Sequence, residues 1–94
     1  MQWITIGTPS LSIEQIETVL AQVGVPDGLE ARYVGTADGQ LRIVSLWESK
    51  AHADLYFAET LPPVLTKVLG PEPVGAPQVV GIEVARTYVR ELVA

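Results

Sequence analysis

The sequence predicts a small α+β domain whose elements follow the order strand, helix, strand, strand, helix, strand. Three observations favour this order. Runs rich in β-branched residues alternate with segments of helical period, an Asp-Gly pair separates two long strand-like runs, and stretches rich in Gly and Pro punctuate the chain. The length of 94 residues fits one domain, residues 1–94, and the absence of cysteine excludes a disulfide framework.

The first strand and helix are predicted within the first 24 residues. Residues 2–7 (QWITIG) are short, β-branched and followed by Thr8-Pro9, as is typical of a strand. Ser12 and Gln15 have the spacing of a capping box, so a helix should begin after Ser12. Apolar residues then recur at helical spacing until Gly24, where the helix should end.

A β-hairpin is predicted around Asp38-Gly39, the strongest short hairpin signal. With a two-residue turn, residues 29–37 pair with residues 40–48, and Arg32 lies opposite Ser45. One face then carries Glu30, Arg32, Val34, Thr36, Leu41, Ile43, Ser45 and Trp47, and the other carries Leu29, Ala31, Tyr33, Arg42, Val44 and Leu46. Neither face is cleanly polar, so we expect both faces of the sheet to be covered.

The second helix and the last strand complete the predicted order. Ser49 is a plausible N-cap, and the helix should run to Pro62-Pro63, which is expected to break it before a short segment over residues 63–69. Residues 70–77 (GPEPVGAP) are typical of a loop, and residues 78–92 alternate like a long strand that should overhang the sheet. The complete order is the split β-α-β pattern called ferredoxin-like, with an antiparallel sheet.

Composition excludes several classes of protein. No stretch approaches the roughly 20 apolar residues of a spanning helix, and no basic residue precedes Arg32, so neither a membrane segment nor a signal peptide is expected. The net charge of −5 disfavours nucleic acid. With no cysteine and His52 as the only histidine, we expect no metal site. A cytoplasmic protein is the default expectation.

The apolar content of the chain predicts a homodimer. Mean hydropathy is +0.29, which is high because a chain this short buries only about two-thirds of its surface as a monomer. The excess falls on both faces of the hairpin, on two stripes of the second helix and along the final strand. One set can pack within the subunit, and the other needs a second copy, bound through the sheet face and the C-terminal strand.

Several segments resemble the dimeric α+β barrel superfamily, and within it small proteins similar to antibiotic-biosynthesis monooxygenases. The segments are Gly28-Leu29, residues 33–35 (YVG), Asp38-Gly39, residues 42–50 (RIVSLWESK) and Leu61-Pro62. The resemblance implies two ferredoxin-like subunits that pair their sheets face to face and let the last strand reach over the partner. Members of the superfamily include cofactor-independent monooxygenases of aromatic polyketides, haem-degrading enzymes and proteins similar to muconolactone isomerase, so the resemblance implies cofactor-independent monooxygenase chemistry as one of several reactions. The chain lacks asparagine, and its single histidine begins a helix, so the haem-degrading activity of other members is disfavoured.

Five residues are candidates for the chemistry. His52 suits proton transfer near neutrality, and Tyr56 follows one helical turn later, so these two are the catalytic candidates. The alternative is that His52 is an exposed residue of the first helical turn. Arg32, Ser45 and Trp47 share one face of the hairpin and are the substrate-binding candidates, with Arg32 for an oxyanion and Trp47 for an aromatic ring.

The alternative to substrate binding by these hairpin residues is structural. Trp47 would then pack in the core, and Arg32 would pair with Glu30 or Glu83.

Two functions are therefore open. The chain is either a cofactor-independent monooxygenase-like enzyme for a small aromatic or polyketide-like substrate, or a homodimer that binds a small molecule or serves structurally without catalysis. An open pocket of about 300 Å³ or more beside Trp47 would favour the enzyme. A pocket closed by Phe57, Trp47 and Ile43 would contradict it.

Overall fold

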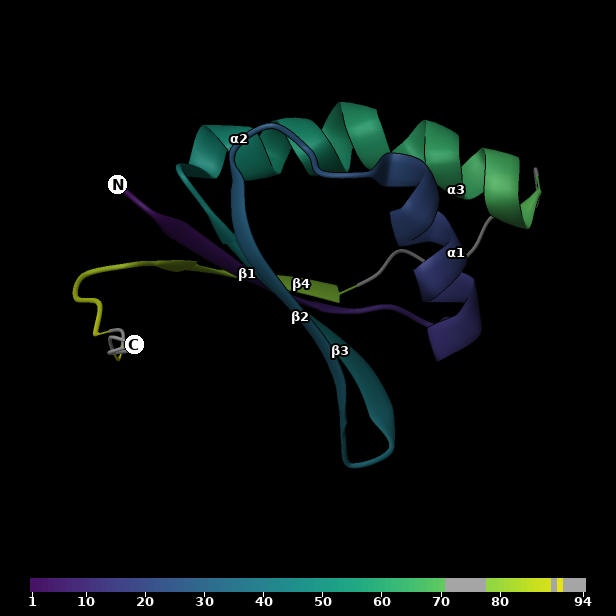
Figure 1. Ribbon diagram of the computed structural model, residues 1–94, viewed down its shortest axis with the longest axis horizontal. Coiled ribbons are helices and arrows are strands. Elements are labelled where there is room, and N and C mark those ends of the chain that lie inside the picture. Colours follow the sequence, from purple (N-terminus) through teal and green to yellow (C-terminus); the bar gives the residue numbers. More distant parts are fainter. Residues whose placement is uncertain (71–77, 89, 91–94) are drawn as a thin grey trace, which may run out of the picture.

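Helices cover one face of a four-stranded antiparallel sheet in the computed structural model, which describes residues 1–70, 78–88 and 90 (Figure 1). The strand order is β2-β3-β1-β4. The strands are β1 (Trp3–Thr8), β2 (Leu29–Ala37), β3 (Gln40–Trp47) and β4 (Gln78–Glu83). The helices are α1 (Ile13–Val23), α2 (Lys50–Leu55), the π-helical turn η1 (Tyr56–Thr60) and α3 (Leu61–Leu69). The predicted ferredoxin-like order is confirmed, and none of the described helices is long and apolar enough to cross a membrane.

The start of α1 has the predicted capping box. The Ser12 hydroxyl accepts from the backbone N–H of Gln15 at 3.2 Å, and the Gln15 side chain accepts from the backbone N–H of Ser12 at 3.0 Å. The helix ends at Gly24, whose N–H donates to the carbonyl of Leu20. Ile16 and Val19 are buried on the face of α1 that turns toward the sheet.

The hairpin has the predicted register over most of its length. Asp38 and Gly39 both adopt positive φ, as a two-residue turn with the twist of its strands requires. Arg32 pairs with Ser45, but a β-bulge between Leu29 and Ala31 inserts one extra residue. Because side chains alternate along a strand, that insertion exchanges the faces predicted for two residues. Leu29 packs in the aromatic core, and Glu30 accepts a hydrogen bond from Gln2 at the surface.

The elements α2, η1 and α3 follow one another without a gap and form one continuous second helical segment. The predicted break at Pro62-Pro63 and the separate segment over residues 63–69 are therefore wrong. A π turn precedes the prolines, in which the N–H of Leu61 donates to the carbonyl of Tyr56, five residues earlier. In a regular α-helix, the ring of an interior proline clashes with the carbonyl group four residues earlier. The wider π turn displaces those carbonyl groups, so the clash is avoided. The prolines occupy the first turn of α3, where a missing N–H is tolerated.

The last strand is shorter than the predicted range of residues 78–92. β4 ends at Glu83, opposite Trp3, where β1 also begins. Val84 still donates its N–H to the carbonyl of Gln2, but no partner strand continues beyond that point among the described residues. Residues 71–77 of the predicted loop, and residues 89 and 91–94 of the predicted strand, lie outside the described part of the chain.

Gly28 allows the chain to approach α2 closely before β2 begins. Its φ is +84°, and a Cβ atom added there would overlap the imidazole ring of His52. We therefore expect Gly28→Ala to lower the free energy of unfolding by about 2 kcal/mol, through backbone strain and displacement of His52. Urea denaturation measures the change. Gly35→Ala is the matched control, because Gly35 has no positive φ and no atom near its missing Cβ. Equal losses in the two variants would contradict this account.

Candidate functional site

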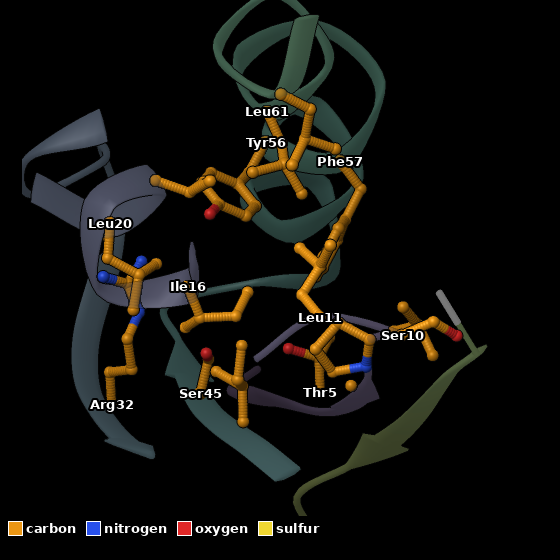
Figure 2. Close-up of a pocket in the computed structure, with 16 residues that line it drawn as sticks. Thr5, Ser10, Leu11, Ile16, Leu20, Arg32, Ser45, Tyr56, Phe57 and Leu61 are labelled. Atoms are coloured by element: carbon orange, nitrogen blue, oxygen red, sulfur yellow. The ribbon is translucent and has the colours of Figure 1, made fainter. Parts of the chain in front are cut away.

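A cavity of about 90 Å³ lies between the helices and the sheet, under the π turn (Figure 2). Its walls come from β1, the loop after β1, α1, both hairpin strands, the π turn, α3 and β4. Most of the lining is apolar: Gly7, Pro9, Leu11, Ile16, Val19, Leu20, Ile43, Phe57, Leu61, Leu65 and Val79. The polar lining residues are Thr5, Ser10, Arg32, Ser45 and Tyr56.

Two rows of paired residues form the floor of the cavity. In the first row the register joins Arg32 to Ser45, Ser45 to Thr5, and Thr5 to Gly81. This row carries the polar groups of the floor. The second row joins Ile43 to Gly7 and Gly7 to Val79, and the missing side chain of Gly7 leaves room between its two neighbours.

Trp47 contacts both the floor of the cavity and the helices above it. Its side chain is fully buried, and the indole N–H donates to the Thr5 hydroxyl at 3.0 Å. The ring also packs against Tyr56, with centroids 5.0 Å apart, and against Phe57 at 6.3 Å. Trp47 does not line the cavity, so its position matches the core alternative and leaves no ring face open to a ligand.

Arg32 and Tyr56 lie toward the same end of the cavity. Figure 2 shows the Tyr56 hydroxyl directed toward the Arg32 side of the cavity. Burial raises the pKa of Tyr56, and the nearby positive charge of Arg32 offsets part of that rise. The phenol is therefore a neutral hydrogen-bond donor at pH 7. Neither Glu30 nor Glu83 pairs with Arg32, and among the described residues no carboxylate forms an ion pair with it.

His52 lies outside the cavity, at the first turn of α2. Its Nδ1 is 2.8 Å from the Ser49 hydroxyl, and its Nε2 is 3.9 Å from a carboxylate oxygen of Glu48. Its ring packs against Gly28, and its backbone N–H donates to the Ser49 hydroxyl that caps the helix. His52 thus belongs to the first turn of α2, and it does not lie beside the candidate residues Arg32 and Ser45.

Sequence reasoning named Tyr56 and Phe57 but missed the walls that α1 and α3 supply. The apolar face of α1 was visible as a pattern, but its role as a wall containing Ile16 and Leu20 was not. The π turn turns both Tyr56 and Phe57 toward the cavity, and Leu61 follows at the five-residue spacing of that turn. Only the Pro-Pro pair after the turn hinted at irregular helix geometry.

The cavity is smaller than the roughly 300 Å³ expected of an open substrate pocket. Phe57 and Ile43 narrow it, although Arg32, Ser45 and Tyr56 still reach it. This volume suits a single small ring with one polar substituent rather than a molecule of several fused rings.

No family model matches the sequence, and no curated protein matches it significantly. Solved structures do match over nearly the whole chain. A protein from Deinococcus radiodurans, provisionally assigned to the antibiotic biosynthesis monooxygenases, is 19% identical, with a TM-score of 0.60 over 95% of this chain and 98% of that one.

Two further similar structures have different activities. SnoaB, a cofactor-independent oxygenase from Streptomyces nogalater, is 12% identical, with a TM-score of 0.58 over 92% of this chain and 93% of its own. The hydroxynitrile lyase from Passiflora edulis is 15% identical, with a TM-score of 0.56 over 93% of this chain and 95% of its own. The chain therefore has the ferredoxin-like α+β fold of antibiotic-biosynthesis-monooxygenase-like proteins, a fold that hosts more than one reaction.

The raised pKa of Tyr56 predicts a pH dependence of stability. An unfolded tyrosine ionises at about pH 10. The buried phenol resists ionisation, so its contribution is fully present below about pH 10 and is lost as the pH rises from there through the folded pKa. We expect the free energy of unfolding of wild type to fall more steeply above pH 10 than that of Tyr56→Phe, by at most about 1.4 kcal/mol per pH unit.

Urea titrations at pH 8 and at pH values above 10 test this expectation. Tyr88→Phe is the control, because the Tyr88 ring is 89% exposed in the segment after β4. It should keep the wild-type slope. If Tyr56→Phe also kept that slope, Tyr56 would not be buried as described.

Proposed function

We propose that the cavity binds a small aromatic or polyketide-like molecule through one of its oxygen atoms, and that the chain acts on it as a cofactor-independent oxygenase-like enzyme. The observation that carries the proposal is Arg32, a guanidinium without a described carboxylate partner at one end of an apolar cavity. A guanidinium there favours a ligand oxygen that bears negative charge. Ser45 and Tyr56 can donate further hydrogen bonds to the same end.

This arrangement would favour ionisation of a bound phenol or enol. The Arg32 charge lowers the pKa of an acidic hydroxyl beside it, and the apolar walls strengthen the interaction by excluding water. A monooxygenase that uses no cofactor takes both electrons from its substrate. In such a reaction a CH₂ group and O₂ become a carbonyl group and water, and the carbanion or enolate that precedes oxidation is the species Arg32 would stabilise.

Binding without catalysis is the second candidate function, and two observations favour it. The cavity of about 90 Å³ is well below the roughly 300 Å³ expected of an open enzyme pocket, and Phe57 and Ile43, two of the side chains expected to close such a pocket, line it. Of the described residues that line the cavity, none is Asp, Glu, His or Lys. Tyr56 is held neutral and is a donor rather than a base. An enzyme built this way would depend on a substrate acidic enough to lose its proton with help from Arg32 alone.

Binding of 4-nitrophenol tests the role of Arg32, because the absorbance of this dye reports its ionisation. We expect wild type to lower the apparent pKa of the bound dye. Arg32→Met should weaken binding of the phenolate about 10- to 100-fold, the value of a charge-assisted hydrogen bond. Arg42→Met is the matched control, since Arg42 lies on the opposite face of the hairpin and donates to Gln40. Equal affinities for the two variants would overturn the proposal.

Catalysis is tested separately with phloroglucinol, a compact single ring whose keto form has acidic CH₂ groups. Under ¹⁸O₂, an oxygenase should give a product that carries one labelled oxygen, detected by mass spectrometry, at a rate that falls in Arg32→Met. Dye binding without labelled product would support the binding function instead.

The outer face of the sheet supports a homodimer, which we also propose. Two apolar rows cross all four strands on this face: Tyr33, Val44, Ile6 and Val80 in one, and Ala31, Leu46, Ile4 and Ile82 in the other. Tyr33 and Val80 are 69% and 59% exposed. An exposed apolar patch of this extent marks an interaction surface. A second copy would cover it with the same two rows, and any contact from the C-terminal segment would add to that interface.

Light scattering tests the dimer. Wild type should have about twice the mass of the 10.1 kDa chain at micromolar concentration, and Val80→Asp should be monomeric because it places a charge within the apolar patch. Val25→Asp is the control, as Val25 is exposed in the loop between α1 and β2, away from the sheet. A monomeric wild type, or a dimeric Val80→Asp, would contradict this interface.

A further inference from the structure

The cavity adjoins a second, more open hollow. This groove has a volume of about 380 Å³ and lies between the second helical segment and β4. The cavity and the groove share four lining residues, which are Phe57, Leu61, Leu65 and Val79. The groove adds Asp54 and Pro62 at its outer side, whereas Arg32, Ser45 and Tyr56 belong to the cavity alone.

Phe57 is the largest of the shared side chains, and aromatic contacts hold its ring in place. The ring meets Tyr56 edge to face, with centroids 5.0 Å apart and an interplanar angle of 80°, and it meets Trp47 at 6.3 Å and 61°. Trp47 is itself fixed to Thr5 by its hydrogen bond. The ring therefore has a defined position between the two hollows.

The volumes of the cavity and the groove, which Phe57 separates, limit the size of the ligands that fit each of them. The cavity of about 90 Å³ accepts a small head group, and a longer molecule has to extend past Phe57 into the groove. The groove could hold an apolar extension along Leu61 and Leu65. Among the described residues that line the groove, Asp54 is the charged one, and it is paired with Lys50 at 2.9 Å, so this part of the groove does not favour a charged extension.

We propose that Phe57 is the specificity-determining residue of the proposed binding site: its ring closes the cavity against the groove and limits ligands to a single ring with a short substituent. This inference rests on the proposed function, because it places the oxygen atom of the ligand at Arg32 and the substituent at Phe57. Removing the ring joins the two hollows and admits molecules with an uncharged apolar tail.

A series of 4-alkylphenols, from methyl to hexyl, tests the partition by calorimetry on the full chain. For wild type we expect the affinity to peak at a short chain and to fall at least tenfold by 4-hexylphenol. For Phe57→Ala we expect the affinity to rise with chain length, by up to about fourfold for each buried methylene. 4-Hexylphenol should then bind at least as tightly as 4-ethylphenol.

Two further variants keep the test decisive. Phe57→Leu retains an apolar side chain in case Phe57→Ala fails to fold, and it should shift the preference toward longer chains in the same direction. Leu55→Ala is the matched control, because Leu55 is an exposed apolar residue of the same helical segment that lines neither hollow. It should keep the wild-type profile.

The outcomes separate this inference from the proposed function. If wild type and the Phe57 variants bind the phenols with the same dependence on chain length, Phe57 does not set the limit, and the function is untouched. If Leu55→Ala changes the profile as much as the Phe57 variants do, the effect is not specific to the partition, and the inference is wrong. If wild type binds none of the phenols, both proposals fail.

Discussion

The hydrogen bond from the Trp47 indole to the Thr5 hydroxyl is the interaction on which the geometry of the cavity depends. It joins β1 and β3, the two central strands, at a point with no access to water, where an unpaired indole N–H would cost about 1–3 kcal/mol. The Trp47 ring then positions Tyr56 and Phe57 by direct packing. One buried contact thus fixes the floor of the cavity and the aromatic side chains above it in a single arrangement.

The alternation of side chains along the strands gives this small sheet two faces of different composition. On the inner face, the row that begins at Arg32 places polar groups opposite the apolar side chains of the helices. A ligand oxygen and a ligand ring would therefore have different surroundings within one small volume. On the outer face, the neighbouring positions form continuous apolar rows. The apolar excess of the sequence is therefore divided between the lining of the cavity and the exposed outer face, which we propose to pair with a second subunit.

The sequence predicted the features that depend on local patterns. The capping box, the Asp-Gly turn and the register that pairs Arg32 with Ser45 all follow from short-range rules, and all are present. The bulge at Glu30 and the π turn at Tyr56 were missed because each is a one-residue irregularity that tertiary packing stabilises and no periodicity reveals. The same irregularities decide which side chains reach the cavity. Arg32, Ser45 and Tyr56 could thus be named in advance as candidates, and Phe57 as a side chain able to close the pocket, whereas the place of Phe57 between two hollows could not. For His52 the sequence left two positions open, and the structure decides for the one in the first turn of α2, outside the cavity.

The central claim is that this cavity receives the oxygen-bearing ring of a small molecule. A crystal structure of the protein soaked with 4-nitrophenol tests it most directly. The account predicts the phenol oxygen within hydrogen-bond distance of the Arg32 guanidinium, with the ring between Ile16 on α1 and Phe57 on the π turn. A dye bound elsewhere on the surface, or a cavity left without dye at saturating concentration, would contradict it.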